Sequence, residues 1–300
     1  MEAPPQPWPT GLSEQCEPLV RRVLAPNASP YTFTGTQTYL VGAGAEVAVI
    51  DPGPAGTGAE GHADTRGEGH VAAIIAALGY AKLAAILCTH THRDHSPAAA
   101  ELKRLTGAQI IGCAPLVLED DGPRADAAFD PDYAPDRVLV DGEQLTGPDW
   151  TITAVATPGH TSNHLCYALE ESGALFTGDH VMAWSTSVVS PPDGDMAAYM
   201  ESLQKLYDRE DKVLYPAHGP AITKPKQLVR GMLGHRRSRE AQILRLLGEA
   251  PQAIPDMVKV MYKGLDPRLN GAAGRSVLAH LIDLRHRGKV TSTGDTWQLT

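Results

Sequence analysis

Short apolar runs rich in β-branched residues alternate with helix-like segments along the first 180 residues. From Thr32 the chain reads TFTGTQTYLVGAGAEVAVIDPGP, two apolar runs separated by glycine and closed by Pro52 and Gly53, which predicts a hairpin of buried strands. The pattern then predicts a helix over 71–78 and a strand over 85–89. This β–α–β order favours an α/β fold, in which helices pack on a sheet.

The alternation of helices and strands continues down the chain. Ser96 followed by Pro97 indicates a helix start, and the helix is predicted to run to about Leu105. Residues 120–136 are rich in Asp, Pro and Ala without periodicity, which predicts a long surface loop and a candidate rim for a substrate. A helix is also predicted over 196–207, and strands over 109–112, 137–140, 150–156, 164–169 and 174–177.

The C-terminal segment differs from the rest in pattern and in charge. Helices predicted near 234–247, 254–262 and 274–287, followed by β-like pieces at 289–291 and 296–299, indicate a winged-helix arrangement. Residues 231–300 hold 11 Lys and Arg against 6 Asp and Glu, a net charge of +5, which leaves −14 for residues 1–230. We therefore predict two domains, 1–230 and 231–300.

Composition narrows the class of protein. A hydrophobic fraction of 42% with 20% charged residues is typical of a globular protein with a buried core. No stretch approaches the ~18 consecutive apolar residues of a membrane helix, and Met1 to Pro9 lacks the features of a signal peptide. We expect a cytoplasmic protein without a membrane partner. The four cysteines form no CxxC pair and are interpreted as reduced packing residues.

Candidate metal ligands follow the ends of several predicted strands. The strand ending at Thr89 leads into HTHRDH, so four candidate ligands (His90, His92, Asp94 and His95) fall within six residues. Three more follow later apolar runs, each beside a glycine that lets the backbone turn sharply, namely His160, Asp179 and His218. Burying this set without a metal would leave uncompensated charge at a cost of several kcal/mol. Imidazole and carboxylate together suit Zn²⁺, with Fe²⁺ or Mn²⁺ as alternatives.

The His-x-His-x-Asp-His run with the later histidine, aspartate and histidine resembles the signature of metallo-β-lactamase-fold hydrolases. The resemblance implies an αββα sandwich and two metal ions per chain. It implies that the first ion is bound by His90, His92 and His160, that Asp179 bridges both, and that the second is bound by Asp94, His95 and His218. The runs GTQTYLVG at 35–42, LFTGD ending at Asp179, PAHGP at 216–220 and HRRSRE at 235–240 resemble the lactamase-beta-2-like subgroup, which usually has asparagine where this chain has Gln37.

Two zinc ions about 3.5–4 Å apart hold a bridging water and lower its pKa toward ~7, which supplies hydroxide as the nucleophile. Asp94 and Asp179 are the candidate catalytic residues, because either could orient this water or accept its proton. His164 and His180 adjoin the ligands and are candidates for substrate contact, with hydrogen bonding to the ligands or simple packing as the alternative. His62 and His70 are predicted to be loop residues.

Four functions remain open from the sequence, and the fourth, an iron oxygenase or flavin-linked diiron protein, would differ mainly in the metal bound. Hydrolysis of a small ester, thioester, lactone or lactam suits the acidic first domain, with weak β-lactamase activity compatible with it. Cleavage of single-stranded RNA, which the subgroup resemblance implies for some members, is the alternative. A non-catalytic module that binds nucleic acid or protein is the third, and the complete ligand set argues against it. We rank the small-molecule substrate first.

The basic C-terminal domain is the candidate RNA-binding surface. Its alternative role is to pack on the catalytic domain or on the second subunit of a homodimer. The residues that could neutralise phosphates are Arg236, Arg237, Arg239, Arg275, Arg285, Arg287 and Lys289.

Overall fold

The computed structural model describes residues 9–55, 65–117 and 129–300. The chain forms two compact units, each assembled from separate segments of the sequence. Unit 1 comprises Met1–Ala156, Asn163–Ser185 and Glu210–Pro225, and unit 2 comprises Thr157–Ser162, Thr186–Arg209 and Lys226–Thr300.

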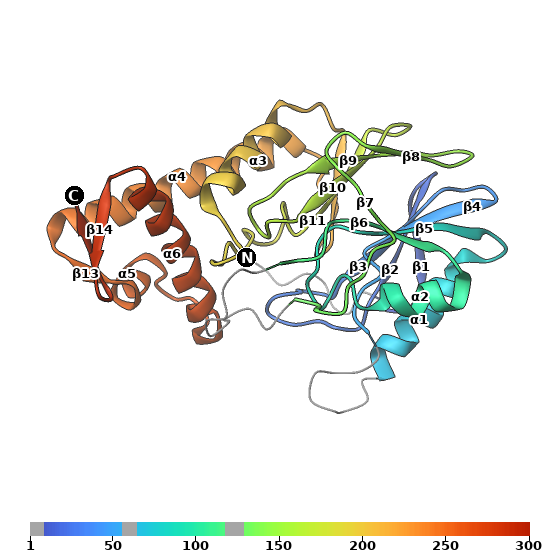
Figure 1. The fold of residues 1–300 in the computed structure, drawn as a ribbon, viewed down its shortest axis with the longest axis horizontal. Coiled ribbons are helices and arrows are strands. Elements are labelled where there is room, and N and C mark those ends of the chain that lie inside the picture. The colour runs from blue at the N-terminus through green and yellow to red at the C-terminus, as the bar shows by residue number, and fades with distance from the viewer. Residues whose placement is uncertain (1–8, 56–64, 118–128) are drawn as a thin grey trace. The chain divides into compact units, whose positions relative to one another are not determined.

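The first sheet of unit 1 has seven strands in sequence order: β1 (Ser13–Glu17), β2 (Val20–Leu24), β3 (Gln37–Val41), β4 (Glu46–Ile50), β5 (Lys82–Cys88), β6 (Gln109–Gly112) and β7 (Arg137–Val138). β3 and β4 form the predicted antiparallel hairpin, and β4 to β7 run parallel. Helices α1 (Thr65–Leu78) and α2 (Ala98–Thr106) contact each other and lie on one face of this sheet (Figure 1).

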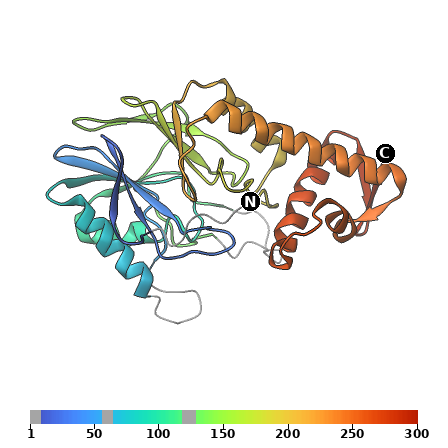
Figure 2. The same cartoon turned by 180° about the vertical axis from the view of Figure 1, so that it is seen from behind.

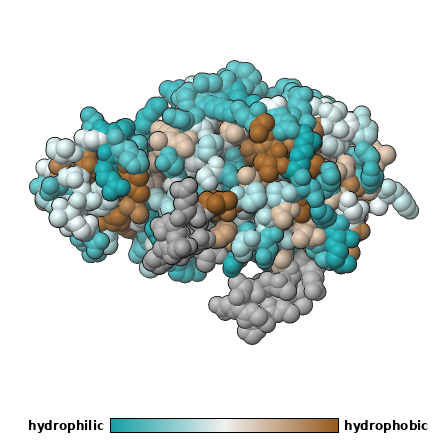
Figure 3. Space-filling model, viewed as in Figure 1, coloured by the Kyte–Doolittle hydropathy of each residue, from teal (hydrophilic) through white to brown (hydrophobic). Residues whose placement is uncertain are grey.

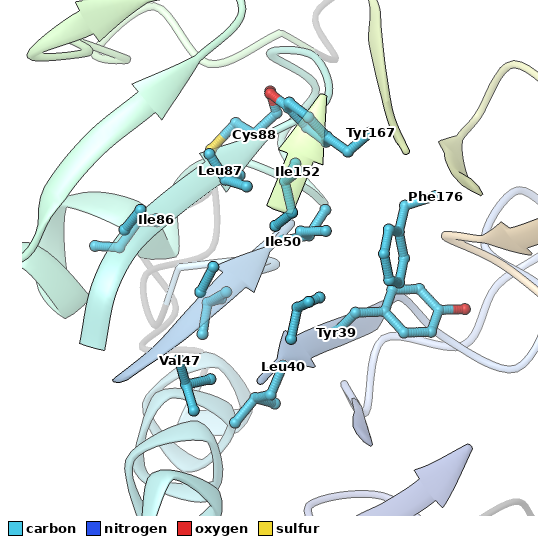
Figure 4. Close-up of a cluster of buried hydrophobic side chains, with 14 of the residues drawn as sticks. Tyr39, Leu40, Val47, Ile50, Ile86, Leu87, Cys88, Ile152, Tyr167 and Phe176 are labelled. Carbon is cyan, nitrogen blue, oxygen red and sulfur yellow. The ribbon is translucent and has the colours of Figure 1, made fainter. Parts of the chain in front are cut away.

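The second sheet of unit 1 has the order β12-β11-β10-β9-β8. Its strands are β8 (Gln144–Thr146), β9 (Thr151–Ala156), β10 (Leu165–Leu169), β11 (Ala174–Gly178) and β12 (Val213–Pro216). One apolar core joins both sheets, because Tyr39 and Ile50 of the first lie with Ile152 and Phe176 of the second (Figure 4). The Tyr39 and Phe176 rings lie 5.1 Å apart between centroids.

Parallel pairing brings the ends of several strands together. β4 pairs in parallel with β5, and β11 pairs in parallel with β12. The carboxyl ends of parallel neighbours meet at the same edge of a sheet. The segments that begin at Asp51, Thr89, Asp179 and Ala217 all leave from such ends. This arrangement is what concentrates ligands from distant parts of the sequence.

Unit 2 contains helices and a small sheet (Figure 2). Its helices are α3 (Met196–Asp208), α4 (Pro225–Glu249), α5 (Ile254–Met261) and α6 (Asn270–His286). Strands β13 (Gln252–Ala253), β15 (Thr296–Leu299) and β14 (Val290–Thr293) form an antiparallel sheet in that order. Helices α4, α5 and α6 with the β14–β15 hairpin match the predicted winged-helix arrangement, whose core includes Ile243, Val277 and Trp297.

Some sequence predictions need correction. The helix expected from Gly234 begins nine residues earlier, because a continuous buried face starts at Val229 and tolerates Gly231 and Gly234 inside the helix. Residue 230, the predicted domain boundary, lies within α4, and the boundary itself stays a prediction. Strands β1 and β2 were not predicted, since charged residues interrupt their apolar pattern.

His70 is not a loop residue as predicted. It lies in α1, is 1% exposed, and its Nε2 lies 2.8 Å from the hydroxyl of Thr38. His62 and residues 118–128, which include much of the predicted 120–136 loop, lie outside the described residues.

The surface in Figure 3 shows hydrophilic residues between smaller hydrophobic patches. Among the described residues, no helix is both long enough and apolar enough to cross a membrane.

Candidate metal centre

The turn after β5 carries the first four predicted ligands. His90 and His95 are fully buried, and their rings lie 4.0 Å apart between centroids. Nε2 of His90 and Nδ1 of His92 lie 2.9 Å apart. Two imidazole nitrogens at this spacing are compatible with ligands of a single ion.

All seven predicted ligands fall into two groups. In each group the ligand atoms lie within 4.8 Å of one another. The first group is His90, His92, His160 and Asp179, and the second is Asp94, His95 and His218. The division is the one that the family resemblance implies.

Asp179 links the two groups. Its Oδ1 lies 3.6 Å from Nε2 of His95 and 3.3 Å from Nε2 of His218, both of the second group. Oδ2 of Asp94 lies 3.5 and 3.2 Å from the same two nitrogens. A carboxylate that belongs to one group and adjoins the other is placed to serve two ions.

The donor set fits divalent cations. Nε2 of His95 and Nε2 of His218 are buried and make no hydrogen bond within the described part of the chain. Buried polar atoms without a partner are costly, and a site of function is one explanation for them. Nδ1 of each ring is engaged elsewhere, so Nε2, which lies 3.2–3.6 Å from the carboxylates of Asp94 and Asp179, is the nitrogen left to bind an ion.

The pKa values of His95 and Asp94 also indicate that the cluster stabilises positive charge. Burial alone would lower the pKa of His95, but the carboxylates of Asp94, Asp179 and Asp51 outweigh it and raise that pKa well above its ordinary value. Burial likewise opposes ionisation of Asp94, yet His95 and His218 hold its pKa well below the usual range. The carboxylates of this cluster therefore stay ionised and need cationic partners.

Asp51 is a site residue that the sequence analysis missed. It is 2% exposed, and its carboxylate accepts hydrogen bonds from the Thr89 amide and the Thr89 hydroxyl, both at 2.8 Å, and from Nδ1 of His95 at 3.0 Å. Its φ of 50° is unusual for a residue with a side chain. The aspartate after an apolar strand, directly before Pro52-Gly53, was the signal that could have identified it.

Gln37 supports the turn that carries His218. Its side-chain amide donates to the carbonyls of Pro216 and Gly219, on either side of His218. The hydroxyl of Tyr39 donates to the Pro216 carbonyl at 2.7 Å. Glutamine in place of the subgroup's usual asparagine is therefore accommodated, and its amide holds the turn that carries the candidate ligand His218.

Two glycines beside the ligands are required by the backbone. Gly178 has a φ of 48°, and a Cβ there would lie 2.6 Å from the Thr89 hydroxyl. Gly159 has a φ of 137°, and a Cβ there would lie 2.3 Å from Cα of Tyr199. No side chain fits at these distances, so the predicted role of glycine next to the ligands is borne out at both positions.

His164 and His180 are buried beside the cluster. They are 1% and 0% exposed, and the His164 ring lies 5.1 Å from that of His90 and 5.8 Å from that of His180. This burial favours the alternative in which they support the ligands. Their contact with substrate stays a prediction.

An aromatic pair adjoins the His218 turn. Phe33 stacks on Trp184 with centroids 4.7 Å apart and planes inclined by 10°. A Cβ at Gly219 would lie 2.9 Å from Trp184 and 3.5 Å from Phe33. Both rings are half-buried, and Phe33 has a φ of 57°. A partly exposed aromatic wall next to a ligand suits an apolar group of a substrate.

The described end of the predicted 120–136 loop runs beside the ligand turn. Phe129 forms an antiparallel bridge with His92, and the Asp130 amide donates to the Thr91 carbonyl at 2.6 Å. The side chain of Arg93 donates to the Phe129 carbonyl. This part of the predicted substrate rim thus adjoins the candidate site.

The prediction that Arg236 neutralises a phosphate is wrong, because the residue is 2% exposed. Of the other basic residues proposed for RNA, Arg239 lies over the Tyr262 ring, 4.3 Å from its centroid. Arg287 pairs with Glu240. Binding of RNA by the remaining basic residues is untested.

Comparisons with known proteins give the family of the chain. The family model of the metallo-beta-lactamase superfamily matches residues 31–218, and that of the beta-lactamase associated winged helix domain matches residues 253–297. The chain is 32% identical over 288 residues to the beta-lactamase-like protein 2 homolog of Drosophila melanogaster, which covers 90% of this chain and 89% of that protein.

A second relative is an atrochrysone carboxyl ACP thioesterase of Paecilomyces divaricatus, 34% identical over 233 residues. The match covers 77% of this chain and 65% of that longer protein. A solved beta-lactamase domain protein from Burkholderia ambifaria has a TM-score of 0.80 at 20% identity, with 99% and 96% of the two chains covered, and shows the fold alone. The predicted α/β class with a C-terminal winged helix is confirmed.

Proposed function

We propose that this chain cleaves acyl thioesters at a site for two divalent metal ions. The chain belongs to the metallo-beta-lactamase superfamily and is a hydrolase of that superfamily. Zinc is the metal that the ligand set suits best, with iron or manganese as alternatives. The coarser conclusion, a hydrolase with a candidate metal site, is independent of which ester the enzyme prefers.

The observation that carries the proposal is the position of Asp179. It groups with His90, His92 and His160, while its Oδ1 lies within 3.6 Å of ligand nitrogens of the second group. A carboxylate shared in this way supports two ions rather than one.

The residues of the candidate site have different roles in the proposed hydrolysis. Divalent ions held by these residues would supply a Lewis acid for the carbonyl oxygen and would lower the pKa of a coordinated water. Asp51 fixes the proton of His95 on Nδ1, and the Gly35 carbonyl does the same for His218, so that both Nε2 atoms stay available to the ions. Asp94, with its side chain 28% exposed, is placed to orient the attacking water or to accept its proton.

Thioesters are favoured within the predicted class of esters, lactones and lactams for two reasons. One relative is named a thioesterase and aligns with 77% of this chain. The Phe33–Trp184 pair beside the His218 turn provides an apolar wall for an acyl chain or ring. A thiolate is also a good leaving group, so the chain need not supply a strong acid for it.

The test is hydrolysis of acyl-coenzyme A and acyl-pantetheine thioesters, followed by release of free thiol. Lactones, lactams and a fluorescent single-stranded RNA are assayed in parallel, and metal content is measured in the same preparations. Asp179→Asn should reduce thioester turnover at least about 100-fold. Asp149→Asn is the matched control, since Asp149 accepts a hydrogen bond from the Ala43 amide away from the ligands.

Parental turnover by Asp179→Asn would refute the metal-dependent reaction. Turnover of RNA but of no thioester would replace the proposed substrate with the ribonuclease alternative. If the parent protein is fully loaded with metal and hydrolyses none of these substrates, the non-catalytic module is favoured.

A further inference from the structure

Arg236 occupies a position in α4 where an apolar residue is expected. The buried residues of this helix recur at steps of three and four, through Val229, Met232, Leu233, Arg236, Ile243, Leu246 and Leu247. Arg236 is 2% exposed. Burying an arginine costs free energy unless its donors are used. Its place on the helix therefore requires a specific partner inside unit 2.

The partner is the segment that precedes α3. The Arg236 guanidinium donates to the main-chain carbonyl of Ser187 and lies over the ring of Tyr199, 5.0 Å from its centroid. A planar guanidinium can lie flat on a ring while its N–H groups donate, whereas the ammonium of lysine is a point charge without a plane to stack. Arg236 thereby fixes both a peptide group and an aromatic ring.

The next carbonyl along this segment holds a predicted metal ligand. Nδ1 of His160 lies 2.6 Å from the Val188 carbonyl oxygen and donates to it. The carbonyls of Ser187 and Val188 belong to consecutive residues, so the position of one constrains the other. The imidazole of His160 is thus oriented by a backbone segment that Arg236 anchors.

Tyr199, the second contact of Arg236, also supports the turn before His160. Gly159 packs so closely that a Cβ there would lie 2.3 Å from Cα of Tyr199. The Asp195 amide donates to the Gly159 carbonyl, and the Tyr199 amide donates to the Asp195 carbonyl, both at 3.0 Å. Arg236 therefore touches both supports of the His160 turn, and all these contacts lie within unit 2.

We propose that Arg236 is a positioning residue for His160, acting through the Ser187–Val188 segment and the Tyr199 ring. The inference rests on the proposed function, in which His160 binds a metal ion. A hydrogen bond from Nδ1 fixes the tautomer and presents Nε2, and loss of such a partner weakens metal binding about 10–100-fold. Arg236 acts one residue away from the bonded carbonyl, so we expect about a 10-fold loss.

The experiment compares Arg236→Met and Arg236→Lys with Arg239→Met in the full-length protein. Arg239 lies three residues along α4, where it donates to the Met261 carbonyl at 2.7 Å and packs on Tyr262. Zinc is titrated against a chromogenic chelator, and thermal unfolding of each metal-free protein is recorded. In the metal-free state, NMR follows the Nδ1 proton of His160.

Arg236→Met should bind one zinc equivalent as the parent does and the other about 10-fold more weakly, with partial recovery in Arg236→Lys. The Nδ1 proton signal of His160 should weaken in Arg236→Met and persist in Arg239→Met. Parental affinity for both equivalents, or an equal loss in Arg239→Met at a matched fall in unfolding temperature, would overturn the proposal. A parent that binds neither zinc, iron nor manganese contradicts the proposed function instead, and the NMR signal then still decides whether Arg236 orients His160.

Discussion

Asp51→Asn changes the charge of a buried side chain while keeping its shape. The carboxylate accepts from the Thr89 amide, the Thr89 hydroxyl and Nδ1 of His95. An asparagine has one acceptor oxygen and one NH₂ donor group. If its oxygen keeps the Thr89 amide, its NH₂ faces the hydroxyl and the imidazole. The hydroxyl can rotate and accept, but His95 can accept only by moving its proton to Nε2.

That proton transfer determines the size of the effect. Nε2 of His95 is the atom that lies 3.5 Å from Asp94 and 3.6 Å from Asp179, and a protonated Nε2 cannot bind a metal ion. A hydrogen bond to a charged group is worth about 1.5–3 kcal/mol. At about 1.4 kcal/mol for each factor of ten, this corresponds to roughly 10–100-fold weaker binding of the ion held by Asp94, His95 and His218.

The assay is competition for zinc between the protein and a chromogenic chelator, with Asp149→Asn as the matched control. We expect Asp51→Asn to retain one tight zinc equivalent and to lose affinity for the other. Thioester turnover should recover in part as zinc is raised, because the remaining ligands are unchanged. If Asp51→Asn binds both equivalents with parental affinity, the argument from the His95 tautomer is refuted.

Three further predictions concern stability, substrate and pH. Gly178→Ala should lower the free energy of unfolding, measured in urea, by about 1–3 kcal/mol, because the new Cβ would lie 2.6 Å from Thr89. Gly231 has open space around it, so Gly231→Ala is the control and should not destabilise the protein. Trp184→Ala should raise KM for aromatic acyl thioesters about 3- to 10-fold and leave acetyl thioesters nearly unchanged; equal effects on both would contradict an aromatic wall. Burial and neighbouring cations lower the pKa of His280 to about 3. Below pH 6.5 the unfolded chain therefore binds more protons than the folded chain. The free energy of unfolding that His280 contributes is complete above pH 6.5 and falls by up to about 1.4 kcal/mol per pH unit on acidification toward pH 3. In His280→Leu this part of the slope should disappear from urea titrations between pH 6 and 4; an unchanged slope would show that His280 does not titrate as described.

Much of the fold follows from local patterns in the sequence. The apolar runs that became β3 to β6 and β9 to β11, and the helical periodicity of α5 and α6, depend on spacing within a few residues. The turn from His90 to His95 was recognisable for the same reason, because four ligands lie in six consecutive positions. Strands β1 and β2 were missed because Arg21, Arg22 and three glutamates or glutamines break their alternation, and only pairing with β3 makes them strands.

The supports of the site depend on tertiary structure. Asp51 and His95 are 44 residues apart, and Gln37 and Pro216 are 179 apart, so no local pattern connects them. Arg236 was interpreted as a surface cation because charge alone does not reveal burial, and only the packing of α4 placed it inside. The sequence by itself determined the fold class and the set of candidate metal ligands, since periodicity and ligand density are local properties. The tertiary structure decided which side chains orient those ligands, because hydrogen bonds between distant segments exist only after the sheets have paired.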